Sequence, residues 1–450
     1  HAAAALTGDR RMSMIEVAAA AGVGRSTLYR HFPTKRALAG ALSEVERPDP
    51  LRTPSADVVP VGHKAPGQLG SARPLRLEVT HVLDEVPPHL IADQLVAEAR
   101  REAGIAIALY VVDIDGSQLV RLAGSDDFPT RLKAPPALGP EIVPEGLPGF
   151  YARLRRRLPQ CTAVPLWLRG RVIGLLLCVG TPVMPLEDIA KQGAAALELA
   201  NDYTDLIEAV RRRKPTTPAA EVQLDLLPPR IVRVTGAQIA GGLLPSYEVA
   251  GDWFDYVENR DGTWVAIAEA LGGGPTAAGF SAAALGALRA ARRSGADLLA
   301  AVSTLDETVR GLGGDGFCIT AILARWHAPT GTVTWVNCGH PPGYVAGHEG
   351  ALRRLDGPEH PPLGRGAGTR WTKTVTRLHP GERLVLVTNG VMERPLESGG
   401  VFGLDGLARA VERAVAPTAP ATALAIQQAV MAAWSEPLED DATLLVLAVD

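Results

Sequence analysis

Apolar residues recur at helical spacing over residues 90–101 and are followed by two short apolar runs, 105–112 and 117–122. The helical spacing predicts a helix. The two runs are of strand length and flank Asp113–Gly116, a segment rich in turn-forming residues. This part of the chain therefore predicts a helix followed by a β-hairpin.

The same signals return further along the chain. Apolar runs at 163–168 and 172–179 flank Arg169-Gly170 and predict a second hairpin. Apolar residues at helical spacing then continue over 186–213, where we expect one long helix that ends in basic residues.

The first residues and the segment after them differ in character. Residues 14–22 and 25–31 predict two short helices separated by a turn that contains glycine. Prolines and glycines then interrupt residues 47–76 so often that regular structure is not expected, and we interpret this segment as a linker.

In the last part of the chain, apolar runs such as 264–267 and 384–387 end beside acidic or amide residues and glycine. Strands that end in carboxylates can converge on a divalent cation, because hard cations prefer oxygen ligands. Five separate blocks hold acidic or amide residues, most of them beside glycine: 248–255, 267–274, 337–342, 388–390 and 440–443.

Composition narrows the classes of function. A length of 450 residues suits about three domains, and a net charge of -4 gives no overall basic field for nucleic acid or anionic lipid. The four cysteines show no close pairing, and no charge-free apolar stretch is long enough to span a membrane. We expect a cytoplasmic protein with no membrane partner.

The five blocks, in this order, resemble the PPM-type serine/threonine phosphatases of the SpoIIE-like branch, over about residues 221–449. The resemblance implies an α/β sandwich of two antiparallel sheets flanked by helices. It also implies two divalent metals, Mn²⁺ or Mg²⁺, and a phosphoserine or phosphothreonine protein as substrate. The implied metal ligands are Asp252, Glu269, the backbone carbonyl of Ala270, Asn389 and Asp440, of which Asp252, Glu269 and Asp440 are also the implied catalytic residues.

Two of these positions depart from the family's pattern. Glu269 stands where an aspartate bridges the metals, and Asn389 stands where another aspartate is expected. Glu269 keeps its charge but extends it by about 1.5 Å, whereas Asn389 keeps an oxygen and loses a charge. Because each cation needs charge compensation, we expect a weakened metal site. By the same resemblance, Asp255 supports the site and His340 belongs to a structural corner.

Residues 17–38 resemble the DNA-binding core of TetR-type repressors. The resemblance implies that a set of polar and basic residues faces phosphates and base edges: Arg25, Ser26, Thr27, Tyr29, Arg30, His31 and Lys35. The alternative is a helical hairpin kept for packing. Residues 2–11 offer little apolar surface for the full first helix of such a module, which indicates a truncated or relict head.

The helix, two hairpins and exit helix of the middle region resemble a GAF-type sensory domain, which implies a small ligand that the sequence does not name. We therefore expect a multidomain α/β protein that forms a homodimer. Its exit helix either transmits a signal by twisting or pairing, or is a passive spacer. The predicted parts are a helix-turn-helix head at 1–46, a linker at 47–76, a sensor at 77–184, a signalling helix at 185–220 and a phosphatase domain at 221–450.

The combined prediction is a bacterial signalling phosphatase. Its substrate in this branch is typically an anti-sigma-factor antagonist, whose dephosphorylation changes transcription. Two alternatives stay open: a metal-poor pseudophosphatase that acts as a scaffold, and a TetR-like DNA-binding regulator that uses the rest of the chain for sensing.

Overall fold

The structure is a computed structural model that describes residues 86–212, 215–245, 251–313, 317–347 and 350–450. The chain divides into two compact units, 1–74 and 75–450, and every described residue lies in the second unit. The predicted helix-turn-helix head and the Pro/Gly linker lie outside the described residues.

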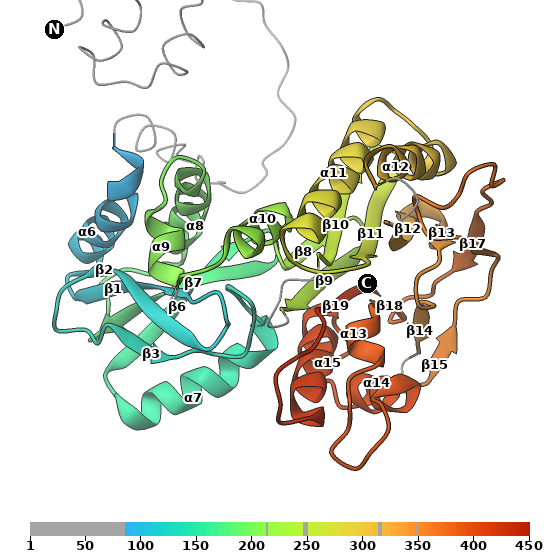
Figure 1. The fold of residues 1–450 in the computed structure, drawn as a ribbon. Coiled ribbons are helices and arrows are strands. Elements are labelled where there is room, and N and C mark those ends of the chain that lie inside the picture. Colours follow the sequence, from blue (N-terminus) through green and yellow to red (C-terminus); the bar gives the residue numbers. More distant parts are fainter. Residues whose placement is uncertain (1–85, 213–214, 246–250, 314–316, 348–349) are drawn as a thin grey trace, which may run out of the picture. The chain divides into compact units, whose positions relative to one another are not determined.

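The second unit begins with a sheet of seven strands in the order β3-β2-β1-β7-β5-β4, with β6 paired to β7. Helices α6 (Ile91–Ala103) and α8 (Glu187–Asn201) pack on one face, and α7 (Leu147–Arg157) packs on the other (Figure 1). Two 3-10 turns, Pro88–Leu90 and Pro144–Gly146, precede α6 and α7. The strands are β1 Ala106–Val112, β2 Gln118–Gly124, β3 Arg131–Lys133, β4 Ala137–Leu138, β5 Glu141–Ile142, β6 Cys161–Leu168 and β7 Arg171–Val179.

Both predicted hairpins are confirmed, each to within two residues at its ends. The β6–β7 turn has positive φ at Arg169 (49°) and Gly170 (83°), the backbone that suits the right-handed twist of a tight hairpin. Successive residues of β1 enter opposite cores. Ile107 and Leu109 face α6 and α8, whereas Ala108 and Tyr110 belong to the core beside α7.

The single helix predicted over 186–213 is wrong. Helix α8 ends at Asn201, and the chain continues as α9 (Leu206–Arg211) and α10 (Pro218–Leu226). Asn, Asp and Thr side chains within 201–205 favour caps and turns over a helix interior, and proline cannot continue a helix. The Thr217 side chain caps α10 by accepting a hydrogen bond from the backbone N–H of Ala220 at 3.3 Å.

Two further sheets of six strands each form the C-terminal sandwich. One has the order β10-β11-β12-β13-β16 with β17 paired to β13, and the other has the order β15-β14-β18-β19-β9-β8. The predicted antiparallel sandwich is confirmed, apart from a short parallel pairing of β13 with β16. The strands are β8 Ile231–Val234, β9 Ala237–Leu244, β10 Trp253–Asn259, β11 Gly262–Ala270, β12 Ile319–His327, β13 Thr332–Cys338, β14 Tyr344–Ala346, β15 Leu352–Arg354, β16 Glu359–His360, β17 Thr374–Arg377, β18 Arg383–Val387 and β19 Ala442–Val449.

Helices cover the outer face of each sheet (Figure 1). The first sheet is covered by α11 (Gly274–Arg293) and α12 (Leu298–Gly313). The second carries α14 (Gly403–Glu412) and α15 (Ala419–Ala433), with the short α13 (Asn389–Met392) beside β19. A 3-10 turn, Ala328–Thr330, joins β12 to β13.

Alternation along the central strands builds three layers of core. In β11, Ala266 and Ala268 face α11 and α12, while Ile267 packs between the sheets. In β19, Leu444 faces α15, while Leu445 packs between the sheets. Such two-sided burial explains why both strands are almost wholly apolar. Within the described ranges, no helix has the length and hydropathy needed to cross a bilayer.

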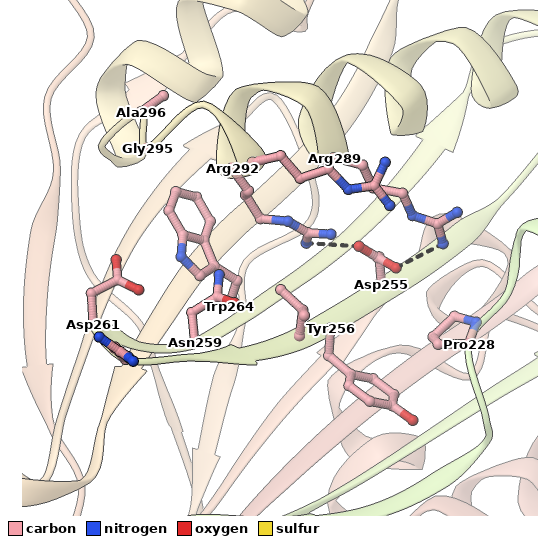
Figure 2. Close-up of a pocket in the computed structure, with 13 residues that line it drawn as sticks. Pro228, Asp255, Tyr256, Asn259, Asp261, Trp264, Arg289, Arg292, Gly295 and Ala296 are labelled. Atoms are coloured by element: carbon pink, nitrogen blue, oxygen red, sulfur yellow. Dashed lines mark hydrogen bonds and ion pairs between the residues drawn. The ribbon is translucent and has the colours of Figure 1, made fainter. Parts of the chain in front are cut away.

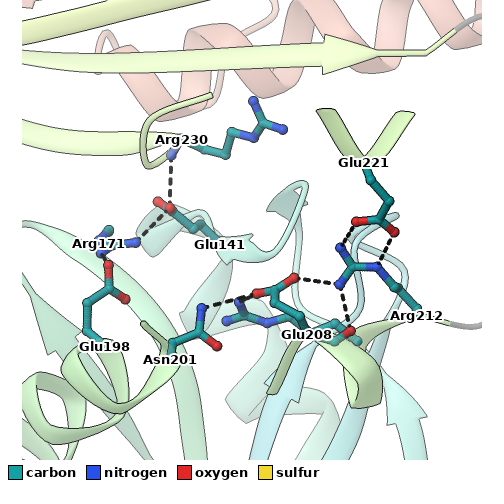
Figure 3. Close-up of polar contacts among 9 residues, drawn as sticks. Glu141, Arg171, Glu198, Asn201, Glu208, Arg212, Glu221 and Arg230 are labelled. Atoms are coloured by element: carbon teal, nitrogen blue, oxygen red, sulfur yellow. Dashed lines mark hydrogen bonds and ion pairs between the residues drawn. The ribbon is translucent and has the colours of Figure 1, made fainter. Parts of the chain in front are cut away.

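A buried glutamate joins the seven-stranded sheet to the sandwich (Figure 3). Glu141 of β5 is 3% exposed and accepts hydrogen bonds from the backbone N–H of Arg230 at 2.8 Å and of Ile231 at 2.9 Å. Its carboxylate also pairs with Arg171 at 2.9 Å, and Arg171 contacts Glu198 of α8. Burial raises the pKa of Glu141, and the Arg171 charge opposes that rise.

A second polar link connects the helices that enter the sandwich (Figure 3). Arg212, directly after α9, pairs with Glu208 at 2.9 Å and with Glu221 of α10 at 2.5 Å. The hydrogen bonds to Glu221 and Glu208 raise the pKa of Arg212, so its guanidinium stays charged. These contacts hold α10 against the end of α9.

Candidate functional site

Strand pairing brings the predicted acidic residues of the first sheet to one edge. Asp252 directly precedes β10, and Glu269 lies next to the end of β11. Because Trp253 pairs with Ala268 in this antiparallel ladder, Asp252 and Glu269 lie opposite one another. The apolar run over 264–267 thus places the acid at its end beside a second acid from the neighbouring strand.

The second sheet supplies its polar residues in the same way. Val387 of β18 pairs with Leu444 of β19, and the backbone N–H of Thr388 donates to the carbonyl of Thr443 at 3.0 Å. Asn389, after β18, and Asp441, before β19, therefore lie at one edge. Gly390 fits closely there, since an added Cβ would lie 2.0 Å from the carbonyl oxygen of Asp441.

Thr388 connects the two sheets through Asp252. Both residues are fully buried, and the Thr388 hydroxyl donates to Asp252 Oδ2 at 2.9 Å. The same hydroxyl oxygen accepts the backbone N–H of Thr443 at 3.0 Å. The other Asp252 oxygen, Oδ1, is buried and makes no hydrogen bond of ordinary geometry with any described residue. The Thr443 hydroxyl lowers the pKa of Asp252 and so lies near this carboxylate. A buried carboxylate oxygen without a well-formed hydrogen bond is the kind of atom that a cation would satisfy.

Glu269 contacts the backbone of Asn389. Glu269 is 5% exposed, and its Oε2 accepts the backbone N–H of Asn389 at 3.1 Å. The longer glutamate side chain thus reaches across to the start of α13. Asp440 is partly exposed, and its Oδ1 accepts the backbone N–H of Asp441 at 2.8 Å.

Negative charge accumulates at this edge. Burial raises the pKa of Asp252 well above its ordinary value, and the carboxylates of Asp441 and Glu269 raise it further. Burial also raises the pKa of Glu269 and of Asp440, with the Glu393 carboxylate adding to both. Within the described residues, Asp252, Glu269 and Asp440 form no ion pair with arginine or lysine.

This donor chemistry suits a hard divalent cation, since several carboxylates lie at one edge without a protein counter-charge. The arrangement is nevertheless open. Across the described ranges, no three His, Cys, Asp or Glu side chains come together closely enough to form a closed metal site. Asp252, Glu269 and Asp440 would hold a cation with the Asn389 side-chain oxygen, and Ala270, buried at the end of β11, would offer its carbonyl.

A small hollow opens beside this cluster. It has a volume of about 130 Å³ and lies between α13 and the segment before β19, where Asn389, Glu393 and Asp440 line it. Arg394 also lines this hollow and is 3% exposed. Its guanidinium donates to the carbonyls of Trp434 at 2.9 Å and Pro437 at 3.0 Å, which fixes the segment that leads to Asp440.

Asp255 does not join the acidic cluster. It pairs with Arg289 at 3.0 Å and with Arg292 at 2.7 Å, so it fastens α11 to β10, and Figure 2 shows both arginines reaching toward it. These residues form part of the wall of a cleft of about 730 Å³ whose lining includes Trp264 and Arg293. The supporting role expected for Asp255 is therefore one of holding a helix in place.

His340 occupies a buried corner. Its backbone N–H donates to Asn337 Oδ1 at 2.8 Å, and its ring Nδ1 lies 2.9 Å from the carbonyl oxygen of Pro341. Burial lowers the pKa of His340 to about 4. A neutral, enclosed imidazole of this kind suits the structural corner expected for it. The residues expected to contact DNA, Arg25 to Lys35, lie outside the described residues.

Sequence reasoning missed the roles of Thr388 and Gln223. Gln223 of α10 is 3% exposed and donates through Nε2 to the carbonyl of Asp252 at 3.0 Å and to Asp441 Oδ2 at 2.6 Å. The available signals were the hydroxyl directly before Asn389 and the glutamine in the segment that opens the last domain. Neither signal indicates its partner, because each partner is distant in sequence.

Two parts of the chain are similar in sequence to known families. Residues 259–450 match the family model described as Stage II sporulation protein E (SpoIIE), and residues 2–42 match that of bacterial regulatory proteins, tetR family. Phosphoserine phosphatase RsbU of Bacillus subtilis (strain 168) is 24% identical over 230 residues, which are 51% of this chain and 68% of that protein.

Two solved structures are also similar. The SiaA-PP2C domain of Pseudomonas aeruginosa shares 22% identity and a TM-score of 0.42, over 47% of this chain and 86% of that one. The phosphatase domain of SpoIIE from Bacillus subtilis shares 19% identity and a TM-score of 0.37, over 48% and 93%. At the level of family models, residues 259–450 are therefore similar to SpoIIE, and residues 2–42 are similar to the tetR family.

Proposed function

We propose that residues 221–450 act as a divalent-cation-dependent phosphatase on phosphoserine or phosphothreonine in a protein. The observation that carries the proposal is the placement of Asp252, Glu269 and Asp440 at one edge of the two sheets, with no cationic partner among the described residues. The matches to SpoIIE and to the phosphoserine phosphatase RsbU support the reaction class.

Charge explains why such a site would need cations. A phosphorylated side chain carries about -1.5 to -2 charges at neutral pH, and Glu393 and Asp440 line the hollow that it would enter. Without cations these carboxylates repel the substrate. The residues of this edge would hold divalent cations, which would supply charge compensation for the phosphoryl oxygens and an activated water for attack on phosphorus.

The protein's own residues would then hold and orient. Asp252 and Glu269 provide buried carboxylates, and Asp440 provides a partly exposed one next to the hollow. Thr388 fixes the orientation of the Asp252 carboxylate through its 2.9 Å hydrogen bond. Asn389 contributes an oxygen without a charge, so we expect weaker cation affinity than an aspartate would give at this position.

We also propose the substrate and the assembly of this phosphatase: a phosphorylated regulator, such as an anti-sigma-factor antagonist, as its substrate, and a homodimer as its working assembly. The seven-stranded sheet with helices on both faces would serve as a GAF-like sensor for a small ligand. The TetR match over residues 2–42 supports a further role in binding duplex DNA, which salt-dependent binding by the full-length protein tests.

A scaffold without turnover is the second candidate. It is favoured by one observation: the described acidic side chains do not close a three-ligand metal site. Calorimetric titration of the full-length protein with Mn²⁺ separates the two candidates, since a phosphatase of this kind binds the cation and a metal-free scaffold does not.

Turnover of a phosphopeptide by the full-length protein, measured against Mn²⁺ and Mg²⁺ concentration, tests the phosphatase directly. Asp252→Asn and Asp440→Asn should each lower turnover by at least about 100-fold, because each removes a carboxylate from the cation site. The exposed Asp356→Asn serves as the matched charge control and should behave as wild type. Near wild-type turnover by either site variant at saturating Mn²⁺ would contradict the proposed ligands.

A further inference from the structure

Helix α10 reaches the acidic edge through a single side chain. The Gln223 amide nitrogen carries two hydrogens and makes two hydrogen bonds, to the Asp252 carbonyl at 3.0 Å and to Asp441 Oδ2 at 2.6 Å. Asp252 leads into β10 of one sheet, and Asp441 leads into β19 of the other. One buried amide thus bridges the two segments whose acidic residues form the candidate site.

The helix that carries this amide is itself held in place. Thr217 caps its start, and Arg289 of α11 donates to the carbonyl of Leu226 at its end at 2.8 Å. Ala219 packs against Ala278 of α11, and Glu221 pairs with Arg212. The amide therefore comes from an element fixed at both ends, which makes its position reproducible.

We infer that Gln223 is a positioning residue for the cation site, an inference that rests on the proposed phosphatase function. Gln223 holds the Asp252 backbone and the Asp441 carboxylate at a fixed separation. Because Asp440 directly precedes Asp441, the same contact sets how closely Asp252 and Asp440 can approach a shared cation. Gln223 touches neither the substrate hollow nor the side-chain oxygens of Asp252. Its effect should therefore fall on cation affinity and on kcat, with the KM for the phosphopeptide unchanged.

The chemistry of the side chain explains why glutamine suits this position. The two hydrogens on its terminal nitrogen let the glutamine side chain donate to a carbonyl and a carboxylate together. Methionine matches its length and lacks both donors. Asparagine keeps the donors but is shorter by one methylene, about 1.5 Å, so it cannot span both acceptors from the same backbone.

The experiment uses the full-length protein with Gln223→Met and Gln223→Asn, each assayed for phosphopeptide turnover against Mn²⁺ concentration. Both variants should raise the half-saturating Mn²⁺ concentration by about 10-fold or more and lower kcat, as loss of a group that orients a metal ligand usually does. Thr217→Ala is the structural control, because it weakens α10 but leaves the amide in place.

The Thr217→Ala protein should keep a Mn²⁺ dependence near that of wild type. Equal shifts in Thr217→Ala and Gln223→Met would mean that α10 acts only through helix stability, and an unchanged Mn²⁺ dependence in Gln223→Met would also overturn the inference.

A second readout separates this inference from the proposed function. The rise in Tm produced by Mn²⁺ requires cation binding but no turnover. If wild type fails to hydrolyse the phosphopeptide, the phosphatase proposal fails. The positioning role is then still decided by whether Gln223→Met weakens the Mn²⁺-dependent rise in Tm and Thr217→Ala does not.

Discussion

Among single residues, the acidic edge depends on uncharged donors as much as on carboxylates. The Thr388 hydroxyl, the Asn389 backbone N–H and the Gln223 amide each fix one acidic group or its backbone. A carboxylate that must hold a cation gains little from being near it unless it is also oriented. These neutral residues are therefore as informative about the site as the acids that the sequence singles out.

The buried imidazole of His340 makes stability depend on pH. Burial lowers its pKa to about 4 in the folded protein, whereas its pKa in the unfolded chain is about 6.5. Between these two pH values the unfolded chain binds more protons than the folded protein. Stability contributed by neutral His340 is thus complete above about pH 6.5 and is lost as pH falls toward 4. The full loss is on the order of 3 kcal/mol.

The His340→Gln variant should lose this part of the acid sensitivity. Urea unfolding of wild type and variant at pH 7.5 and pH 5 provides the measurement. The gap in unfolding free energy between the two proteins should change in favour of the variant as pH falls. A gap that does not depend on pH would show that His340 is not held neutral in the folded state.

Among the elements, close backbone approach determines where α13 can lie. Helix α13 contacts β19, and Gly390 faces the Asp441 carbonyl with no space for a methyl group. Helix α11, by contrast, carries Gly286 at an exposed position with nothing within 4 Å of an added Cβ. The same substitution therefore has opposite consequences in the two helices.

Gly390→Ala should destabilise the protein by more than about 2 kcal/mol, because a backbone carbonyl 2.0 Å away cannot yield as a side chain would. Gly286→Ala should stabilise it by about 0.5–1 kcal/mol through reduced backbone entropy of the unfolded chain. Thermal unfolding of both variants provides the test. A Gly390→Ala protein as stable as wild type would contradict the described packing of α13.

The position of these elements was predictable from sequence only where the signal was local. Both hairpins and the acidic ends of the strands follow apolar runs that the sequence displays directly. The break between α8 and α10 was missed because the apolar spacing continues across Asn201–Asp205, although those residues favour caps. The contact of Gln223 with Asp441 spans 218 residues, and no local pattern specifies a pairing over that separation.

On the scale of the whole second unit, a buried charge joins the seven-stranded sheet to the sandwich. Glu141 satisfies two backbone N–H groups at the start of β8 and pairs with Arg171. Arg230 is itself buried, with its guanidinium 5.3 Å from the centre of the Phe254 ring, and burial lowers its pKa to about 10. The two parts therefore share polar groups that neither satisfies alone.

Glu141→Ala should lower the unfolding free energy by about 3–5 kcal/mol, since it removes the carboxylate that pairs with the buried Arg171 guanidinium and accepts two backbone N–H groups. Glu98→Ala, which removes an exposed ion pair, should change stability by less than about 1 kcal/mol. Calorimetry of both variants measures the difference. If Glu141→Ala unfolds at the wild-type temperature, the buried link contributes nothing to joining the two parts.

The carboxylate of Glu141 also bears on how such chains can be recombined. A chimera that grafts a foreign module onto this sandwich at residue 218 would inherit β8 without the acceptor that completes it. The grafted module would have to place an acidic residue at the same position, or the backbone N–H groups of Arg230 and Ile231 at the start of β8 would lose their acceptor. Any natural exchange of modules at this junction is therefore constrained by one acidic side chain that belongs, in sequence, to the module being replaced.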